Sequence, residues 1–439
     1  MVTRCRNPLD HTAMDETARS SIYAQDAANQ FRWPALSTEL RARIAVIGGG
    51  LTGLSTALHL AEAGQDMVLL EAYQPGWGAS GRNGGQLNPG LKYDPSQIIG
   101  KFGAEAGSRL VEFGWSTVQR TADLIGRLGI DCDLRLNGTL RAAARAADVA
   151  AVRASQQDMA AHGMPVEWVE ADAMTRLTGH DRYHGGFLDK RGGDLDPLRL
   201  CHGLAGAAHA AGARIHGDSR AISLGRDQGR WRITTNTGAV IADRVLICCN
   251  GYADGLVPGL KRAMVPVFSS VLATPPLPDA LAAQIMPGRQ VLYESGLVTV
   301  YYRVDARNRL ILGGRGPMRP VASPERLGPI ADHARRLWPG LTDVGWQTAW
   351  NGRVAVTTDH LPHFHDLGDG LLAIYGYNGR GVALATAMGE PLASCLAGKI
   401  ASAELPIPPT ALSSIRFHAF WPIGVHATIA WSRLRTALT

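Results

Sequence analysis

Residues 76–86, "GWGASGRNGGQ", place polar side chains among closely spaced glycines. Five of these eleven residues are glycine, and Ser80, Arg82, Asn83 and Gln86 lie between or beside them. Glycine loses more conformational freedom on folding than any other residue, so this density predicts a specific use. The segment is either a flexible linker or a backbone that approaches a flat or phosphorylated ligand. The elements around it bear on the choice.

The stretch "RARIAVIGGGLTGLSTALHLAEAG" predicts a strand, a tight turn and a helix. Residues 44–47 form a short apolar run that is typical of a buried parallel strand, and helical spacing of apolar residues follows the turn. Glycines at G-x-G-x-x-G spacing allow the turn, the approach of a pyrophosphate and close packing of helix on strand. The helix N-terminus favours phosphate charge. We therefore expect this turn to bind a cofactor through Gly48, Gly50, Leu51, Thr52 and Gly53.

A second apolar run, "MVLLEA", ends at Glu71, 23 residues after Gly48. An acid at the end of the second strand is placed to accept hydrogen bonds from ribose hydroxyls, and its charge disfavours a 2′-phosphate there. Together with the strand and helix it predicts a dinucleotide site that includes Glu71 and Ala72. The fingerprint alone leaves NAD and FAD open. The glycine-rich segment favours FAD, because Ser80 and Arg82 could serve phosphate or flavin polar atoms while Gly84 and Gly85 admit a flat ring.

Several motifs resemble the D-amino-acid-oxidase-like (DadA) superfamily of FAD-dependent amine oxidoreductases. They are "GGGLTGLSTALHLAEAG", "LLEA", "GWGASGRNGGQL" and "GYNGRGVALATAMGE", and "GASGRNGGQ" is most similar to the gamma-glutamylputrescine oxidoreductase group. The resemblance extends from about Tyr23 over nearly the whole chain. It implies bound FAD, for which we hypothesise non-covalent attachment, and further cofactor-binding positions at Gly78, Ala79, Ser80, Arg82, Asn83, Gly84, Gly85, Gln86, Ala221, Ile222, Asn250, Gly251 and Gly352.

The late motif "YGYNGRGVALATAMGE" repeats the order of strand, glycine-rich turn and helix. In the superfamily this turn faces the oxygen-bearing edge of the flavin ring, which implies cofactor contacts from Gly376, Asn378, Gly379, Arg380, Gly381 and Val382. A helix N-terminus and a cation there would stabilise an anionic reduced flavin. Two such units, far apart in the chain, fit one elongated cofactor held at both ends.

Three residues are predicted to be catalytic and to face the substrate: Tyr302, Arg303 and Trp350. In "YYR", residues 301–303, a tyrosine and an arginine could bind an amine cation and a carboxylate. The alternative is a strand with alternating faces and a surface arginine. The resemblance to amine oxidases supports the substrate-binding interpretation, and it places an aromatic and a glycine at positions 350 and 352.

The predicted fold class is α/β, with a discontinuous Rossmann-like FAD-binding domain and a substrate domain that contains a mixed or antiparallel sheet. The FAD-binding domain is expected at residues 40–135, 195–262 and 351–405, and the substrate domain at 136–194 and 263–350. Residues 1–39 form an N-terminal extension, and residues 406–439 are expected to pack on the protein.

Composition excludes several classes of protein. Hydrophobic residues make up 46% of the chain and charged residues 19%, which is typical of a globular protein. The net charge of +6 is spread without a cluster of like charges, so no nucleic-acid partner is expected. The six cysteines show no C-x-x-C pair, the start lacks an apolar signal region, and no apolar run is long enough to cross a membrane, so a cytoplasmic protein is expected. His360, His363 and His365 lack ligand geometry, and Cys248–Cys249 is interpreted as core, so no metal site is expected. The sequence leaves the oligomeric state open.

The expected reaction is oxidation of a C–N bond in an amine or amino-acid-like substrate, such as a gamma-glutamylputrescine-like compound. Hydride passes to flavin N5, the imine is hydrolysed, and O2 reoxidises the flavin to give hydrogen peroxide. No catalytic base is evident. Three alternatives stay open: a dehydrogenase of D-amino or N-methyl amino acids that uses a quinone or carrier, an NAD-dependent enzyme, and a non-catalytic FAD-binding protein.

Overall fold

A computed structural model describes residues 11–27, 31–296, 300–425 and 427. Its first sheet has the order β17-β18-β11-β1-β2-β8, with β9 and β10 joined to one end of β11. Read from β8 to β18 this is the 3-2-1-4-5 order of a Rossmann-like sheet, and these strands are parallel. The strands are β1 (Glu39–Ile47), β2 (Met67–Leu70), β8 (Arg214–His216), β9 (Ser223–Asp227), β10 (Arg230–Thr234), β11 (Ala239–Ile247), β17 (His363–Asp366) and β18 (Leu371–Tyr375).

Alternation along β1 divides the core of this domain into two layers. Ile44 and Val46 pack with the helices, while Ala45 and Ile47 pack on the opposite face, as successive side chains of a strand must. The helix α3 lies between the sheet and α8 and α12, so it is buried on nearly all sides. The helices of this domain are α3 (Leu51–Glu62), α4 (Pro95–Phe102), α5 (Ala104–Leu128), α8 (Pro197–Ala210), α11 (Gly381–Ala387) and α12 (Gly389–Leu396).

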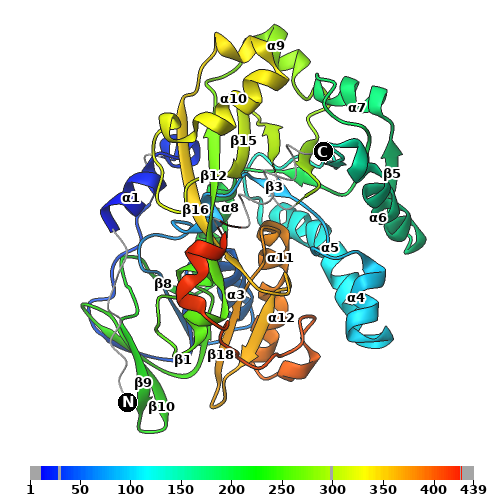
Figure 1. Cartoon of the computed structure of the whole chain (residues 1–439). Coiled ribbons are helices and arrows are strands. Elements are labelled where there is room, and N and C mark those ends of the chain that lie inside the picture. The colour runs from blue at the N-terminus through cyan, green and yellow to red at the C-terminus, as the bar shows by residue number, and fades with distance from the viewer. Residues whose placement is uncertain (1–10, 28–30, 297–299, 426, 428–439) are drawn as a thin grey trace.

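The second sheet is mixed and has the order β16-β12-β15-β14-β13-β4-β6-β5. The β4–β13 pair is parallel and the other pairs are antiparallel. The helices α9 and α10 lie at the top of Figure 1, while α3, α11 and α12 lie in its lower half. Its strands and helices are β4 (Thr139–Ala142), β5 (Val166–Val169), β6 (Gly186–Asp189), β12 (Val265–Ala273), β13 (Val291–Glu294), β14 (Tyr301–Val304), β15 (Leu310–Arg315), β16 (Thr348–Val356), α6 (Val149–Ala161), α7 (Ala171–Thr178), α9 (Asp279–Gln284) and α10 (Gly328–Leu337).

These two sheets confirm the expected fold class, α/β with a Rossmann-like domain and a second domain built on a mixed sheet. The expected domain ranges remain a proposal. Most strands of the two sheets fall within them, but β16 runs through the proposed boundary at residue 350 while pairing with β12 along its whole length. A short two-stranded sheet, β3 (Gln86–Leu87) with β7 (Gly193–Asp194), completes the described strands.

The described part of the N-terminal extension includes two helices, α1 (His11–Arg19) and α2 (Ile22–Asp26). Tyr23 is 2% exposed, and its ring meets the edge of Trp350 at a centroid distance of 5.5 Å. The helix α2 therefore contributes to the folded core.

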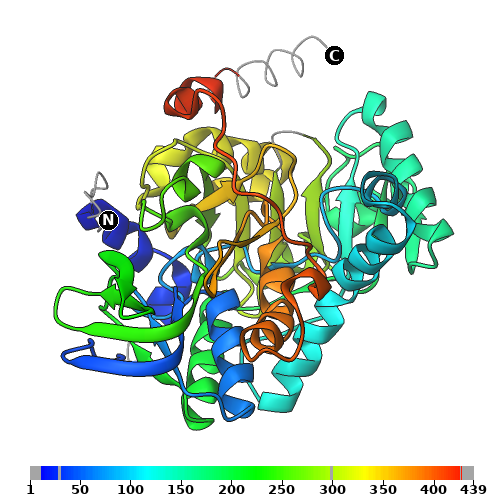
Figure 2. The same ribbon diagram turned by 90° about the horizontal axis from the view of Figure 1, so that it is seen from below.

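The C-terminal segment combines packed and exposed residues. The N–H of Ile415 donates to the carbonyl of Arg262 at 2.8 Å, and His418 Nε2 donates to the carbonyl of Met264 at 2.8 Å. Phe417, Phe420 and Ile423 are all more than 60% exposed, and Figure 2 shows this stretch, in red, at the edge of the molecule. The expected packing of the segment therefore concerns its first part, and residues 428–439 lie outside the described chain.

Candidate cofactor and substrate site

The turn after β1 has the geometry that the glycine spacing predicts. Gly48 has φ = 114°, a conformation that favours glycine, and Gly50 is the N-cap of α3. A Cβ at Gly53 would lie 1.9 Å from the Gly48 carbonyl oxygen, so helix and strand are too close for any side chain there. Leu51 and Thr52 begin α3 and do not line a cavity. The N–H of Leu51 donates to Ser80 Oγ at 3.0 Å, and the Thr52 hydroxyl lies 2.7 Å from the Tyr377 hydroxyl.

Glu71 is fixed beside this turn by backbone donors. Its Oε2 accepts the N–H of Gly49 at 2.6 Å, and its Oε1 accepts the N–H of Tyr73 at 3.0 Å. Burial raises the pKa of the carboxyl group, and these hydrogen bonds and the charge of Arg220 oppose that shift. A carboxylate held in this way has a defined direction for a further hydroxyl donor.

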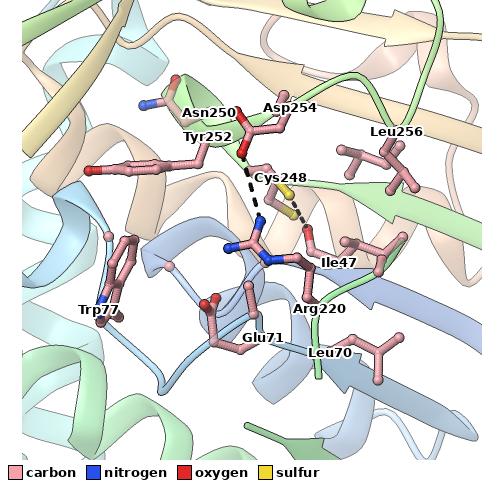
Figure 3. Close-up of a pocket in the computed structure, with 18 of the residues that line it drawn as sticks. Ile47, Leu70, Glu71, Trp77, Arg220, Cys248, Asn250, Tyr252, Asp254 and Leu256 are labelled. Carbon is pink, nitrogen blue, oxygen red and sulfur yellow. Dashed lines mark hydrogen bonds and ion pairs between the residues drawn. The ribbon is translucent and has the colours of Figure 1, made fainter. Parts of the chain in front are cut away.

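A first cavity opens beside Glu71. Figure 3 shows Glu71, Arg220, Trp77 and Tyr252 around it, with an ion pair between Arg220 and Asp254 at 3.7 Å. Of the predicted cofactor-binding residues it is lined by Gly48, Gly50, Glu71, Ala72, Gly78, Ala79, Ser80, Ala221 and Asn250. Further lining residues, which no sequence motif predicts, include Met14, Tyr73, Arg220, Tyr252 and Asp254.

The glycine-rich segment connects this cavity to a second one, because Ala79 lines both. Arg82 is buried in the segment without an acidic partner among the described residues. Its guanidinium donates to the Tyr252 hydroxyl at 2.8 Å and to the Asn351 carbonyl at 3.1 Å, and it lies 4.6 Å from the Trp77 ring centroid. Burial lowers its pKa from the usual value. The segment is an ordered part of the core, not a linker.

The second cavity lies between the second sheet and the late glycine turn. Of the predicted residues it is lined by Ala79, Arg82, Asn83, Gly84, Gln86, Gly352, Asn378, Gly379, Arg380 and Val382. Its further lining residues are Asn88, Lys92, Ser269, Tyr293, Tyr301, Gly314, Arg315, Val354 and Val356. No Asp, Glu or His is among the described residues that line it.

The late turn is held by side-chain amides. Gly376 and Gly379 have φ near 84°, and Asn378 has φ = 53°. The N–H of Gly376 donates to Asn250 Oδ1 at 3.0 Å, which ties this turn to the end of β11. The Asn378 amide bonds the backbone N–H of Thr357 and the carbonyl of Gly376, so its side chain is used within the turn. Gly376 and Gly381 lie beside the cavity but do not line it.

Tyr302 does not face either cavity, and this corrects the prediction of its catalytic role. It is completely buried, and its hydroxyl donates to the Tyr183 hydroxyl at 3.0 Å and lies 3.0 Å from His180 Nε2. Neighbouring residues of a strand point to opposite faces, so Tyr301 faces the second cavity instead. The Tyr301 hydroxyl lies 3.1 Å from Ser269 Oγ.

Arg303 is likewise not placed to bind a substrate carboxylate, because it already has an acidic partner. Its Nη1 lies 2.5 Å from Asp194 Oδ2, and Arg135 shares that carboxylate at 2.6 Å. The other hydrogen bonds of Arg303 go to the carbonyls of Gly84 and Leu195 and to the Tyr23 hydroxyl. Arg303 therefore supports the backbone of the glycine-rich segment through the Gly84 carbonyl.

Trp350 also supports the site without lining it. Its indole N–H donates to the Arg82 carbonyl at 2.9 Å, and the side chain is completely buried. Gly85, with φ = 73°, packs against Arg303, and Ile222 and Gly251 lie outside both cavities. These positions are clear only from the tertiary structure.

The histidines and cysteines that were interpreted as structural residues have ordinary partners. His363 lies 3.0 Å from Asp359, and His365 bonds the Thr410 carbonyl and the Tyr375 hydroxyl. Cys248 and Cys249 lie on opposite sides of the sheet, and burial raises the pKa of both thiols. Within the described residues there is no group of three metal-binding side chains, and no helix is long and apolar enough to cross a membrane.

The donor set fits FAD. A buried acid at the end of β2 and a glycine turn at a helix N-terminus suit the ribose and pyrophosphate, and two cavities that share Ala79 suit an elongated cofactor. When FAD is bound, Glu71 would hold its ribose hydroxyls, and the turn at Gly48–Gly50 would hold its pyrophosphate. The segment at Gly78–Gly84 would run along the isoalloxazine.

Comparisons with known proteins agree with this site. Residues 43–395 match the family model described as DAO, FAD dependent oxidoreductase. The chain is 32% identical to gamma-glutamylputrescine oxidoreductase from Escherichia coli (strain K12), over 86% of this chain and 89% of that protein. It is 31% identical to the probable oxidoreductase OrdL from Rhizobium meliloti (strain 1021), over 85% of this chain and 87% of that protein.

Among solved structures, glycine oxidase from Geobacillus kaustophilus matches with a TM-score of 0.73 at 19% identity, over 85% of this chain and 100% of that one. The Rossmann-like sheet, the buried Glu71 and the paired glycine turns are thus accompanied by a family match over most of the chain. The chain belongs to the DAO family of FAD-dependent oxidoreductases, and it is an FAD-dependent amine or amino-acid oxidoreductase.

Proposed function

We propose that the second cavity is the site at which the C–N bond of an amine or amino-acid-like substrate is oxidised. One observation supports this most directly: the cavity shares Ala79 with the cofactor cavity and is enclosed by Gly352 and the turn at Gly379. A substrate there would lie against the end of the cofactor that the glycine-rich segment borders. The substrate-facing role predicted for Tyr302, Arg303 and Trp350 is reassigned to Tyr301 and Tyr293, which line the cavity.

The residues around this cavity orient the substrate and exclude water. Gln86 Nε2 donates to the carbonyls of Leu292 at 3.0 Å and Tyr302 at 3.2 Å, so the glycine-rich segment is fixed to the second sheet. The ring of Tyr301 fills the space above Gly84 and Gly313, where a Cβ would lie only 2.4 and 2.0 Å from it. Glycine at both positions lets the tyrosine lie flat between them.

The charges of the cavity favour a neutral amine. Arg82, Lys92, Arg315 and Arg380 line it, and no carboxylate does so among the described residues. Nearby positive charge disfavours an ammonium ion, so the bound substrate loses its proton more readily than in water. This accounts for an oxidation that needs no side-chain base.

When bound, FAD would supply the redox chemistry, which is hydride acceptance from the carbon next to nitrogen and electron transfer to O2, with hydrogen peroxide and a hydrolysable imine as products. The names of two similar proteins, gamma-glutamylputrescine oxidoreductase and glycine oxidase, support this choice. A gamma-glutamylputrescine-like compound is one member of the proposed substrate class.

The test is to mix the FAD-loaded protein with amines and amino acids under anaerobic conditions and to follow the visible flavin absorbance. Loss of absorbance with at least one amine is expected, followed by consumption of one O2 per amine and release of hydrogen peroxide in air. Reduction by amine without oxygen consumption would show a dehydrogenase that uses another acceptor. A flavin that no amine reduces would contradict the proposal.

A further inference from the structure

The charged side chains of the second cavity differ in how they are already used. Arg380 donates to the Pro89 carbonyl at 2.7 Å and the Tyr293 hydroxyl at 2.8 Å, and Arg82 is held by Tyr252 and two carbonyls. The side chains of Lys92 and Arg315 have no hydrogen bond or ion pair with any described residue. Both belong to the lining of the cavity, so their donors are free for a ligand.

Lys92 and Arg315 come from separate segments of the chain that line the same cavity. Lys92 follows β3 and the glycine-rich segment, whereas Arg315 ends β15 of the second sheet, where it pairs with Ser269 of β12. Lys92 is exposed, and Arg315 is half-buried. Desolvation at the cavity wall and the charges of Arg380, Arg315 and Arg141 lower the pKa of Lys92 to about 8. Burial lowers the pKa of Arg315.

Two neighbouring cations without a described counter-ion are unfavourable in the free protein. Arg315 is partly desolvated without gaining an opposite charge, and the charges of Lys92 and Arg315 repel each other. A ligand with one carboxylate compensates one positive charge, while a ligand with two carboxylates compensates both. A polyamine adds positive charge to a cavity that already holds four cations and no described acid.

We propose that the substrate of this site is an amine that bears two carboxylate groups, with Lys92 and Arg315 as the residues that determine this specificity. This rests on the proposed function, because it assigns the second cavity to the amine. The amine nitrogen is uncharged when it reacts, so the bound substrate is a dianion. Compounds of this class include N-(carboxyalkyl) amino acids.

A binding experiment tests the charge requirement without any reaction. The FAD-loaded protein is titrated with glutarate and with pentanoate, which have the same number of carbons and differ by one carboxylate, while the flavin spectrum is recorded. Glutarate is expected to bind at least about tenfold more tightly, because a charge-assisted hydrogen bond to each cation requires both carboxylates. Lys92→Met and Arg315→Met should each reduce the preference for glutarate to within about threefold. Lys101→Met, on the exposed side of α4, is the matched control and should keep the full preference.

A kinetic experiment uses secondary amines of similar size with no, one or two carboxylates: dipropylamine, N-propylglycine and N-(2-carboxyethyl)glycine. The rate of anaerobic flavin reduction divided by the dissociation constant should rise along this series, and putrescine should be among the poorest substrates. Equal affinity for glutarate and pentanoate, or equal reduction by the amines with one and two carboxylates, would overturn the assignment of Lys92 and Arg315. If glutarate is preferred but no amine reduces the flavin, the dianion site stands and the proposed function fails.

Discussion

Ser80 Oγ accepts a hydrogen bond from the backbone N–H of Leu51 at 3.0 Å, so the glycine-rich segment is attached to the first turn of α3. A Cβ at Gly50 would lie 2.8 Å from the same oxygen, which shows how closely the two segments approach. The segment that would run along the flavin and the turn that would hold the pyrophosphate are thus one rigid unit.

Replacing Ser80 with alanine should weaken FAD binding rather than unfold the protein. Loss of one hydrogen bond corresponds to about 1 kcal/mol, or about fivefold in the dissociation constant of FAD. Titration of the apoprotein with FAD, followed by quenching of flavin fluorescence, measures it. Ser108→Ala, on the exposed face of α5, should leave the affinity unchanged. Equal affinities in the two variants would show that the contact does not order the cofactor site.

Substitutions at the adjacent residues Tyr301 and Tyr302 should have different effects, the first on flavin reduction and the second on stability. Tyr302→Phe removes the hydroxyl between Tyr183 and His180 and should lower the free energy of unfolding by about 1–3 kcal/mol, with flavin reduction unchanged. Tyr301→Phe should change the rate of flavin reduction by amines and leave stability within about 0.5 kcal/mol. Chemical denaturation and anaerobic stopped-flow measurements on both variants check this. The reverse pattern would support the predicted catalytic role of Tyr302.

Asp194 should be a major source of stability, because it is the buried counter-ion of both Arg303 and Arg135. Asp194→Asn leaves two guanidinium groups without an opposite charge and should cost about 3–5 kcal/mol of unfolding free energy. Asp227→Asn, whose partner Arg232 is on the exposed hairpin of β9 and β10, should cost less than about 1 kcal/mol. Urea unfolding of both variants measures the difference. A small cost at Asp194 would mean that Arg303 keeps its place through its carbonyl partners alone.

Binding of a dicarboxylate should weaken in alkaline solution because of Lys92. The pKa of Lys92 in the free protein is about 8, and a bound carboxylate favours the ammonium form and raises it. The dissociation constant of glutarate should therefore be nearly constant between about pH 6.5 and 7 and rise as the pH passes 8, by up to about tenfold per pH unit. Glutarate itself stays fully ionised over this range. In Lys92→Met the constant should not change between pH 7 and 9.5, and a rise there would assign the titration to another group.

The local sequence determined the cofactor-binding elements. The G-x-G-x-x-G turn, the helix α3 and Glu71 lie where spacing and period predict them, because a tight turn between a buried strand and a helix needs glycine at fixed positions. The fold class follows from the same alternation of strands and helices. The cofactor follows from the glycine-rich segment and its family resemblance.

Only the tertiary structure decided which polar residues face the substrate. Period-two alternation places Tyr301 and Tyr302 on opposite faces of β14, but the sequence does not tell which face is turned to the substrate. That depends on which side of β14 is covered by α10 and which by the cofactor-binding domain. The sequence gives no sign of an acidic partner for Arg303, whereas the fold places Asp194 2.5 Å from its guanidinium. Lys92 and Arg315 have no common sequence motif, and they line one cavity because two distant segments meet there. Short-range sequence patterns report on the backbone near each residue, whereas charge compensation depends on which side chains the fold brings together.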